Sequence, residues 1–99
     1  MKIALEFIGL KVDDEFPINV YFRGQIVSEL FADLVVNELI ILELKAVNQI
    51  VEEYEAQLLN YLKATKIEVG YVMNFGKSAT FKRKVFDNER KGSLSWLNQ

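Results

Sequence analysis

Hydrophobic and polar residues alternate early in this chain with the two-residue period of a β-strand. Ile18, Val20 and Phe22 are separated by polar or amphipathic residues, which predicts a strand with one wet face. Arg23-Gly24-Gln25 directly after them predicts a hairpin turn. Ala4–Leu10 is expected to be the end of a short helix that closes near its glycine.

Two further strands are expected before the middle of the chain. The second covers about Leu30–Val36 and turns near Asn37-Glu38, and the third covers Leu39–Ala46. The third segment is apolar on both faces, so we expect it to be central in the sheet.

The longest predicted helix opens the second half of the chain. Apolar or aromatic residues recur there at three- and four-residue spacing, at Val51, Tyr54, Leu58, Tyr61 and Leu62. Two more strands are expected over Ile67–Phe75 and Thr80–Phe86, the last at an edge. This order predicts an α/β (α+β) sheet domain with a crossover after the central strand. We expect one domain over residues 1–86 and a polar C-terminal tail over 87–99, with Trp96 as its only strong anchor.

Composition narrows the chemistry that such a domain can carry. The 99 residues are 51% hydrophobic, which is typical of one globular domain, and no run of about 18 apolar residues predicts a membrane span. Cysteine is absent, which excludes disulfides and thiolate chemistry and fits a cytoplasmic location. Histidine is absent too, so acid–base or metal chemistry must use Asp, Glu, Lys or Tyr. Oxygen ligands favour magnesium, manganese or calcium over zinc.

Charge is distributed unevenly along the chain. The net charge is −2, so the domain lacks the strongly basic footprint of many nucleic-acid-binding proteins. The last quarter is nevertheless basic, and Lys82, Arg83 and Lys84 are consecutive there. This stretch is interpreted either as a phosphate-facing patch that binds nucleic acid or as an ordinary solvated face.

The most informative residues are charged ones within the apolar strands. Glu43 and Lys45 lie two apart in the third strand and therefore point to the same face. Buried charges are costly unless they are paired or bind a cation. Asp33 in the preceding strand shares that face if the loop is centred on Glu38, for example with three residues in the loop, or if a bulge restores the parity. A two-residue turn would instead pair Asp33 with Leu42.

If the parity holds, these residues form a metal site. Asp33 and Glu43 are expected to coordinate Mg²⁺ or Mn²⁺, which would polarise a phosphate and lower the pKa of a bound water. Lys45 would hold the attacking water or offset charge that develops on the phosphate. The alternative is that Glu43 and Lys45 form a weak, exposed pair at a strand end.

The long helix offers a second pair. Gln57 and Tyr61 lie four apart and therefore on the same helix face. An amide beside a phenol could position a metal-bound water or a nucleotide. Alternatively, Tyr61 is a core residue and Gln57 is simply a good helix former.

Four collinear blocks of this sequence carry a resemblance to a known family. The blocks are Ala32–Val36, Glu43–Val47, Glu55–Thr65 and Gly70–Gly76, within about residues 4–85. They resemble the GxxExxY protein family of the PD-(D/E)XK nuclease-like superfamily. The resemblance implies a restriction-endonuclease-like αβββαβ core, with a central mixed sheet flanked by helices. It implies that Asp33 and Glu43 are metal ligands and that Lys45 is the catalytic lysine. Gln57 and Tyr61 match the Gln-x-x-x-Tyr motif of the RecB-like branch.

The resemblance also implies a shortened member of that family. The namesake Gly-x-x-Glu-x-x-Tyr segment and its glutamate have no counterpart among these residues, and Tyr54 stands where members commonly carry histidine. Two acidic ligands instead of three predict weak metal binding.

Three functions therefore remain open. The first is a metal-dependent nuclease that acts on DNA or RNA. The second is a catalytically impaired module that keeps the fold and binds nucleic acid or dimerises, and the third is a purely structural interaction protein. Apolar residues near the start of the chain, Ile3, Leu5, Phe7 and Ile8, predict a homodimer.

Overall fold

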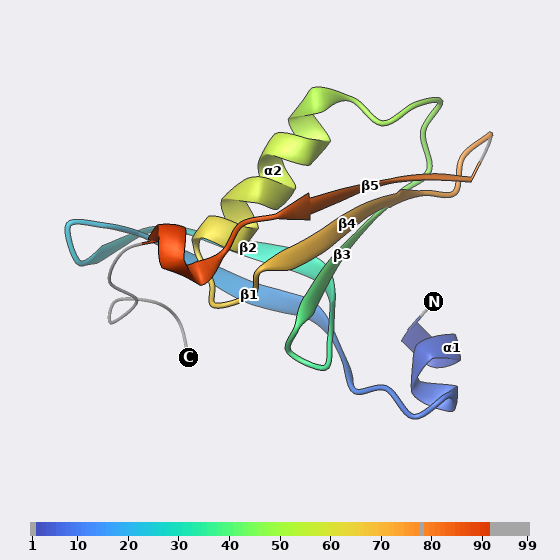
Figure 1. Ribbon diagram of the computed structural model, residues 1–99, viewed down its shortest axis with the longest axis horizontal. Helices are drawn as coiled ribbons and strands as arrows, with labels where there is room; N and C mark the ends of the chain where they lie inside the picture. Colours follow the sequence, from blue (N-terminus) through green and yellow to red (C-terminus); the bar gives the residue numbers. More distant parts are fainter. Residues whose placement is uncertain (1, 78, 92–99) are drawn as a thin grey trace.

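A five-stranded mixed sheet with a long helix packed on it forms the body of the protein (Figure 1). The computed structural model describes residues 2–77 and 79–91. In chain order the elements are α1 (Lys2–Phe7), β1 (Val12–Phe22), β2 (Gln25–Val36), β3 (Ile40–Lys45), α2 (Glu52–Lys63), β4 (Val69–Asn74), β5 (Thr80–Val85) and the 3₁₀ helix η1 (Asn88–Lys91). The strands are arranged in the order β1-β2-β3-β4-β5. The expected αβββαβ core, followed by one more strand, is confirmed.

The central strand lies where the sequence predicted it. β3 pairs with β2 in antiparallel orientation and with β4 in parallel orientation, and α2 makes the crossover between β3 and β4. Consecutive β3 residues point to opposite faces, and both Ile41 and Leu42 are buried. The strand is therefore covered on both sides.

The β1–β2 hairpin is longer than the sequence pattern predicted. Arg23 and Gly24 both have positive φ (52° and 79°), the geometry of a two-residue type I′ turn. Phe22 then pairs directly with Gln25, so β2 begins at Gln25 and the predicted start at Leu30 was wrong. Residues 25–29 do not alternate between apolar and polar, and both faces of the strand are exposed there, so the sequence pattern did not reveal it.

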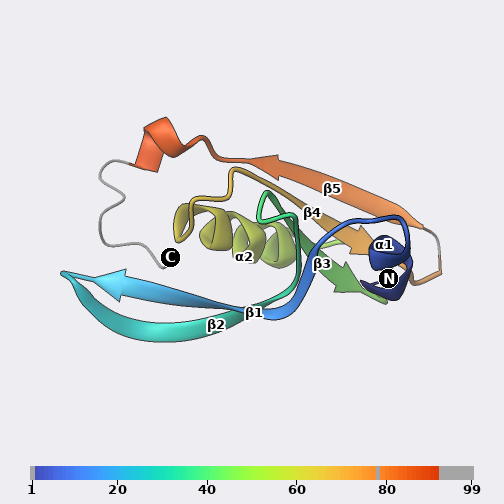
Figure 2. The same cartoon turned by 90° about the horizontal axis from the view of Figure 1, so that it is seen from below.

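Two apolar clusters cover the two faces of the sheet. Ile41 and Leu42 are neighbours in β3 that point to opposite faces, and each belongs to a different cluster. The cluster under α2 contains Ile18, Ala32, Val35, Ile41, Leu58, Tyr61, Leu62, Ala64, Ile67 and Val72. The other cluster contains Val12, Leu34, Val36 and Leu42, with Leu5 of α1 packed against it. Figure 2 shows the sheet curving around α2, with α1 near one end.

A bend in the β1–β2 ribbon lies between these clusters. Ala32 and Leu34 are two apart in β2, yet Ala32 packs under α2 and Leu34 packs on the opposite face. At the same level Glu15 of β1 has φ 48°, and its pair with Asp33 is missing from the ladder. A residue in this conformation turns the strand, so the candidate acid Asp33 lies at the bend.

The charged residues at the two ends of helix α2 stabilise it. Three glutamates in its first turn and Lys63 in its last complement the helix dipole. The helix approaches β4 closely, because a Cβ at Gly70 would lie 2.6 Å from Leu58 Cδ1. The absence of a side chain at Gly70 therefore allows α2 to pack closely on β4.

The predicted C-terminal tail begins with an ordered turn. Asn88 Nδ2 donates to Lys66 O at 3.0 Å, and Lys91 Nζ donates to Thr65 O and Ile67 O, each at 2.9 Å. Residues 88–91 are therefore held against the end of α2, and the predicted anchor Trp96 lies outside the described residues. Among the described residues, no helix is long and apolar enough to cross a membrane.

Candidate functional site

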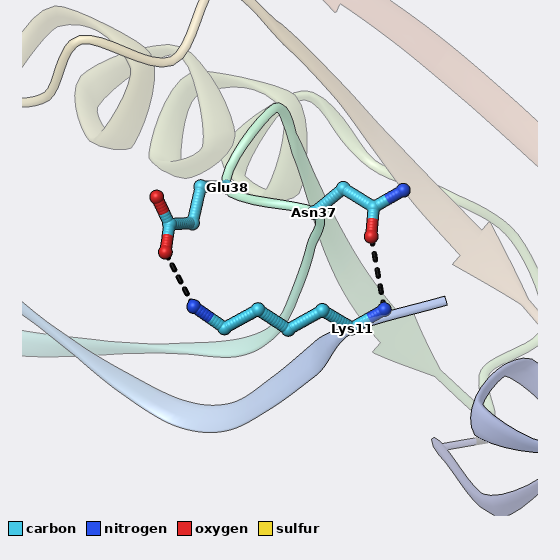
Figure 3. A network of polar contacts seen from close by, with 3 residues as sticks. All are labelled: Lys11, Asn37 and Glu38. Carbon is cyan, nitrogen blue, oxygen red and sulfur yellow. Dashed lines mark hydrogen bonds and ion pairs between the residues drawn. The ribbon is translucent and has the colours of Figure 1, made fainter. Parts of the chain in front are cut away.

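The turn between β2 and β3 determines which residues face each other at the site. Asn37 and Glu38 both have positive φ (52° and 59°), and Leu39 N donates to Val36 O at 3.0 Å, so three residues make the turn. Figure 3 shows how Lys11 fastens this turn to the start of β1. Lys11 N donates to Asn37 Oδ1 at 2.9 Å, and the Lys11 ammonium pairs with Glu38.

A three-residue turn places Asp33 opposite Glu43. Leu34 pairs with Leu42 in the β2–β3 ladder, so the next pair in that register is Asp33 with Glu43. The ladder ends there, and Leu44 N donates instead to Asp33 Oδ2 at 2.8 Å. The loop length that the shared site requires is therefore present.

Glu43 is almost completely buried, with 4% of its surface exposed. Burial, then a hydrogen bond with Asp33 and the negative charge of Asp33, raise the pKa of Glu43 to about 8, whereas the positive charge of Lys45 opposes the shift. Glu43 Oε1 has no hydrogen-bond partner among the described residues. A buried carboxylate oxygen without a partner is costly, and a cation would satisfy it.

Lys45 follows Glu43 on the same face of β3. Its ammonium nitrogen lies 4.7 Å from the centre of the Tyr54 ring, within the range of a cation–π contact. Because Glu43 is buried and Lys45 is only half exposed, the two residues do not form an exposed pair at a strand end.

Helix α2 carries two polar side chains that are hydrogen-bonded to each other, and one of them, Tyr61, lies near these acids. Gln57 Nε2 donates to Tyr61 Oη at 3.0 Å, as the four-residue spacing allows. Tyr61 is 3% exposed and packs in the core under α2, yet its hydroxyl group interacts electrostatically with Glu43 and Asp33. Burial and then the charges of Glu43 and Asp33 raise the pKa of Tyr61. Tyr61 is therefore both a core residue and a wall of the site.

The comparison with known families identifies the superfamily of this domain. A family model described as the PD-(D/E)XK nuclease superfamily matches residues 1–85. The chain belongs to the PD-(D/E)XK nuclease superfamily. No curated protein and no solved structure matches the chain. The finer placement in the GxxExxY family stays a prediction.

Nucleases of the PD-(D/E)XK superfamily generally use divalent metals, and the residues present fit such an ion in part. Asp33 and Glu43 supply oxygen donors, and the unsatisfied Glu43 Oε1 is suited to a hard cation. Glu15 stands in register with Asp33, but its side chain is exposed. Within residues 2–77 and 79–91, no three acidic side chains are arranged to hold a metal. Further ligands would be water, phosphate or backbone carbonyl oxygens.

The basic stretch lies on the edge strand β5, and Lys82 is two strands from Glu43, because Val72 of β4 pairs with both residues. Lys82 and Lys84 share one face of β5, and Arg83 points to the other. Lys84 Nζ pairs with Glu55 Oε1 at 2.8 Å, and Glu55 and Gln57 are separated by about 200° around the α2 axis. Lys82 and Lys84 therefore flank α2 on the side opposite Gln57, and their role in nucleic-acid binding stays a prediction.

The sequence pattern did not assign a site role to Tyr54 or Asn74, two residues that the structure places beside Lys45. Tyr54 precedes Gln57 by three positions, so the common helix face of 54, 57 and 61 was a signal for it. Asn74 lies opposite Lys45 and is buried. A polar residue at the end of an otherwise apolar strand was the available signal for Asn74.

Proposed function

We propose that this chain is a Mg²⁺-dependent nuclease domain that cleaves phosphodiester bonds in DNA or RNA. The observation that carries the proposal is the position of Asp33 opposite Glu43, one step beyond the last paired residues of the β2–β3 ladder, together with a buried Glu43 oxygen that lacks a partner. Membership of the PD-(D/E)XK superfamily supports the same chemistry.

The residues of the site have distinct roles in this proposal. Asp33 and Glu43 would hold Mg²⁺ or Mn²⁺, which supplies Lewis-acid polarisation of the phosphate and a more acidic water. To bind the cation as a carboxylate, Glu43 must first lose its proton, and both its burial and the neighbouring Asp33 favour the protonated form. Lys45 orients the attacking water or offsets charge on the phosphate. Gln57 and Tyr61 support this arrangement from α2 by orienting a water or the nucleotide.

A catalytically impaired module that binds nucleic acid or dimerises is the second candidate. Two observations favour it: the site has two carboxylates, and the raised pKa of Glu43 keeps that residue largely neutral at pH 7. Both weaken the attraction for a divalent cation. The two functions differ in whether Lys45 matters for cleavage.

Cleavage assays separate the two candidates. The assay follows nicking of supercoiled plasmid and cutting of single-stranded oligonucleotides in millimolar Mg²⁺ or Mn²⁺, with and without EDTA. The proteins are wild type, Lys45→Ala and Lys77→Ala, and the last is a matched control because Lys77 is exposed in the β4–β5 loop. We expect slow cleavage by wild type and by Lys77→Ala, and a loss of roughly 100-fold or more in Lys45→Ala.

EDTA should abolish the cleavage. Lys45→Ala should keep its fold by circular dichroism, and it should keep any salt-sensitive nucleic-acid binding by Lys82, Arg83 and Lys84. Equal cleavage by wild type and Lys45→Ala, or cleavage that resists EDTA, would favour the impaired module.

A further inference from the structure

Asn74 is a polar side chain buried at the end of β4, with 1% of its surface exposed. A buried amide is costly unless its polar atoms are hydrogen-bonded. Asn74 Nδ2 donates to Val47 O, and Asn74 Oδ1 accepts from Val47 N and from Gly76 N, each at 3.0 Å. The amide therefore cross-links the segment that leaves β3 to the segment that leaves β4.

The two segments approach each other too closely for a larger residue. Phe75 N donates to Lys45 O at 2.7 Å. A Cβ added at Gly76 would lie 2.0 Å from Val47 O and 2.9 Å from Val47 C. Those neighbours are backbone atoms and cannot rotate away. Gly76 therefore permits the close approach of the two segments, and the Asn74 side chain holds them together by hydrogen bonds.

Lys45 is the functional residue at this junction. It is the last residue of β3 and faces Asn74 in the parallel pair. Its side chain is long and flexible, so the position of its ammonium depends on a fixed backbone at its base. Among the described residues, the hydrogen-bond partners of Asn74 are Val47 and Gly76, not the acids Asp33 and Glu43.

We propose that Asn74 is the positioning residue for Lys45. Its amide fixes the backbone from which Lys45 extends, so the ammonium stays over the Tyr54 ring and near the Glu43 carboxyl group. The proposal rests on the proposed function for the catalytic role of Lys45. A displacement of about 1 Å in a reacting group can lower a rate roughly 100-fold, so a residue that does not touch the metal ligands can still control catalysis.

The position of Lys45 can be measured without any cleavage. An ammonium over an aromatic ring brings its ε-methylene protons into the ring current, which shifts their NMR signal upfield. In wild type we expect an upfield Lys45 signal that is lost in Tyr54→Leu. Asn74→Ala should move it toward the value of an exposed lysine. Asn48→Ala should leave it unchanged, because Asn48 is an exposed asparagine in the same β3–α2 loop.

Steady-state kinetics test whether the hydrogen bonds of Asn74 affect the rate of cleavage. Asn74→Ala is compared with wild type at a temperature at which circular dichroism shows both folded. We expect kcat to fall roughly 100-fold, while KM and the affinity for Mn²⁺ stay within about threefold. A merely structural residue would lower Mn²⁺ affinity and cleavage together, in proportion to the loss of folded protein, and that result would overturn the proposal.

A second variant covers the case in which Asn74→Ala does not fold. Asn74→Asp keeps acceptors for Val47 N and Gly76 N but places a carboxylate oxygen against Val47 O in place of the donor, so the same NMR shift should be reduced. An unchanged Lys45 signal in folded Asn74→Ala or Asn74→Asp would overturn the proposal. If wild type does not cleave at all, the proposed function fails, and the NMR comparison still decides whether Asn74 positions Lys45.

Discussion

Glu43 stands at a position where an apolar side chain would pack without cost. It follows Ile41 on the α2 face of the central strand, and its neighbours there are largely apolar. Burying a carboxyl group beside Asp33 raises its pKa to about 8, which is a cost to the folded state at neutral pH. A carboxyl group at such a site is consistent with a role in binding rather than in stability.

The titration of Glu43 makes stability depend on pH in a specific direction. Its pKa rises from 4.5 to about 8 on folding, so between these values the unfolded chain releases a proton that the folded protein keeps. In EDTA, the free energy of unfolding should therefore fall as pH rises from about 5 to about 8, by at most about 1.4 kcal/mol per pH unit, and then level off. Urea unfolding at several pH values measures it.

Glu43→Gln is the control for this pH dependence. The amide cannot titrate, and the chain contains no histidine or cysteine, so the variant should show a much flatter profile across the same range. If wild type and Glu43→Gln have the same slope, Glu43 does not titrate as described.

At the scale of the elements, periodicity predicted the order of helices and strands and the central place of β3. It also showed that a shared site needs a loop centred on Glu38 or a bulge, but it could not choose between turns, because the contacts of Asn37 and Glu38 with Lys11 are made across the fold. The sequence shows that Tyr54 shares a helix face with Gln57 and Tyr61, but its contact with Lys45 also depends on how α2 crosses the sheet.

The turn that sets the register should be sensitive to Asn37. Asn37→Ala removes the acceptor for Lys11 N, worth about 1 kcal/mol, and forces an alanine to adopt positive φ at a cost of about 1–2 kcal/mol. We expect urea unfolding to show a loss of roughly 2–3 kcal/mol.

Asn37→Gly separates the two contributions. Glycine adopts positive φ freely, so only the hydrogen bond is lost, and the variant should be more stable than Asn37→Ala by about 1 kcal/mol. Equal stability of both variants and wild type would show that this turn does not depend on Asn37.

At the scale of the whole molecule, the outer strands carry features that discourage pairing at the sheet edges. β1 contains Pro17 and three consecutive acidic residues, and β5 contains three consecutive basic residues. Apolar exposure is instead high on and just after α1, where Ile3, Phe7 and Ile8 are 82%, 91% and 69% exposed. A second copy of the chain covering α1 is thus the geometry we expect for the predicted homodimer.

The homodimer prediction is tested at this surface. Light scattering at micromolar concentration should give a dimer mass for wild type and a monomer mass for Phe7→Asp. Val27→Asp is the matched control, because Val27 is an exposed apolar residue in β2, outside α1, and this variant should remain dimeric. A monomeric wild type would contradict the prediction, and so would loss of the dimer in both variants.

Calorimetric titration with Mn²⁺ at pH 7 tests whether Asp33 and Glu43 together hold a divalent cation. We predict weak binding by wild type, with an observed heat that depends on the buffer because Glu43 releases its proton as the metal binds. Asp33→Asn and Glu43→Gln should each weaken binding by roughly tenfold or more, and Glu43→Gln should remove the dependence on buffer. No binding by wild type, or equal binding by all three proteins, would contradict the proposed site.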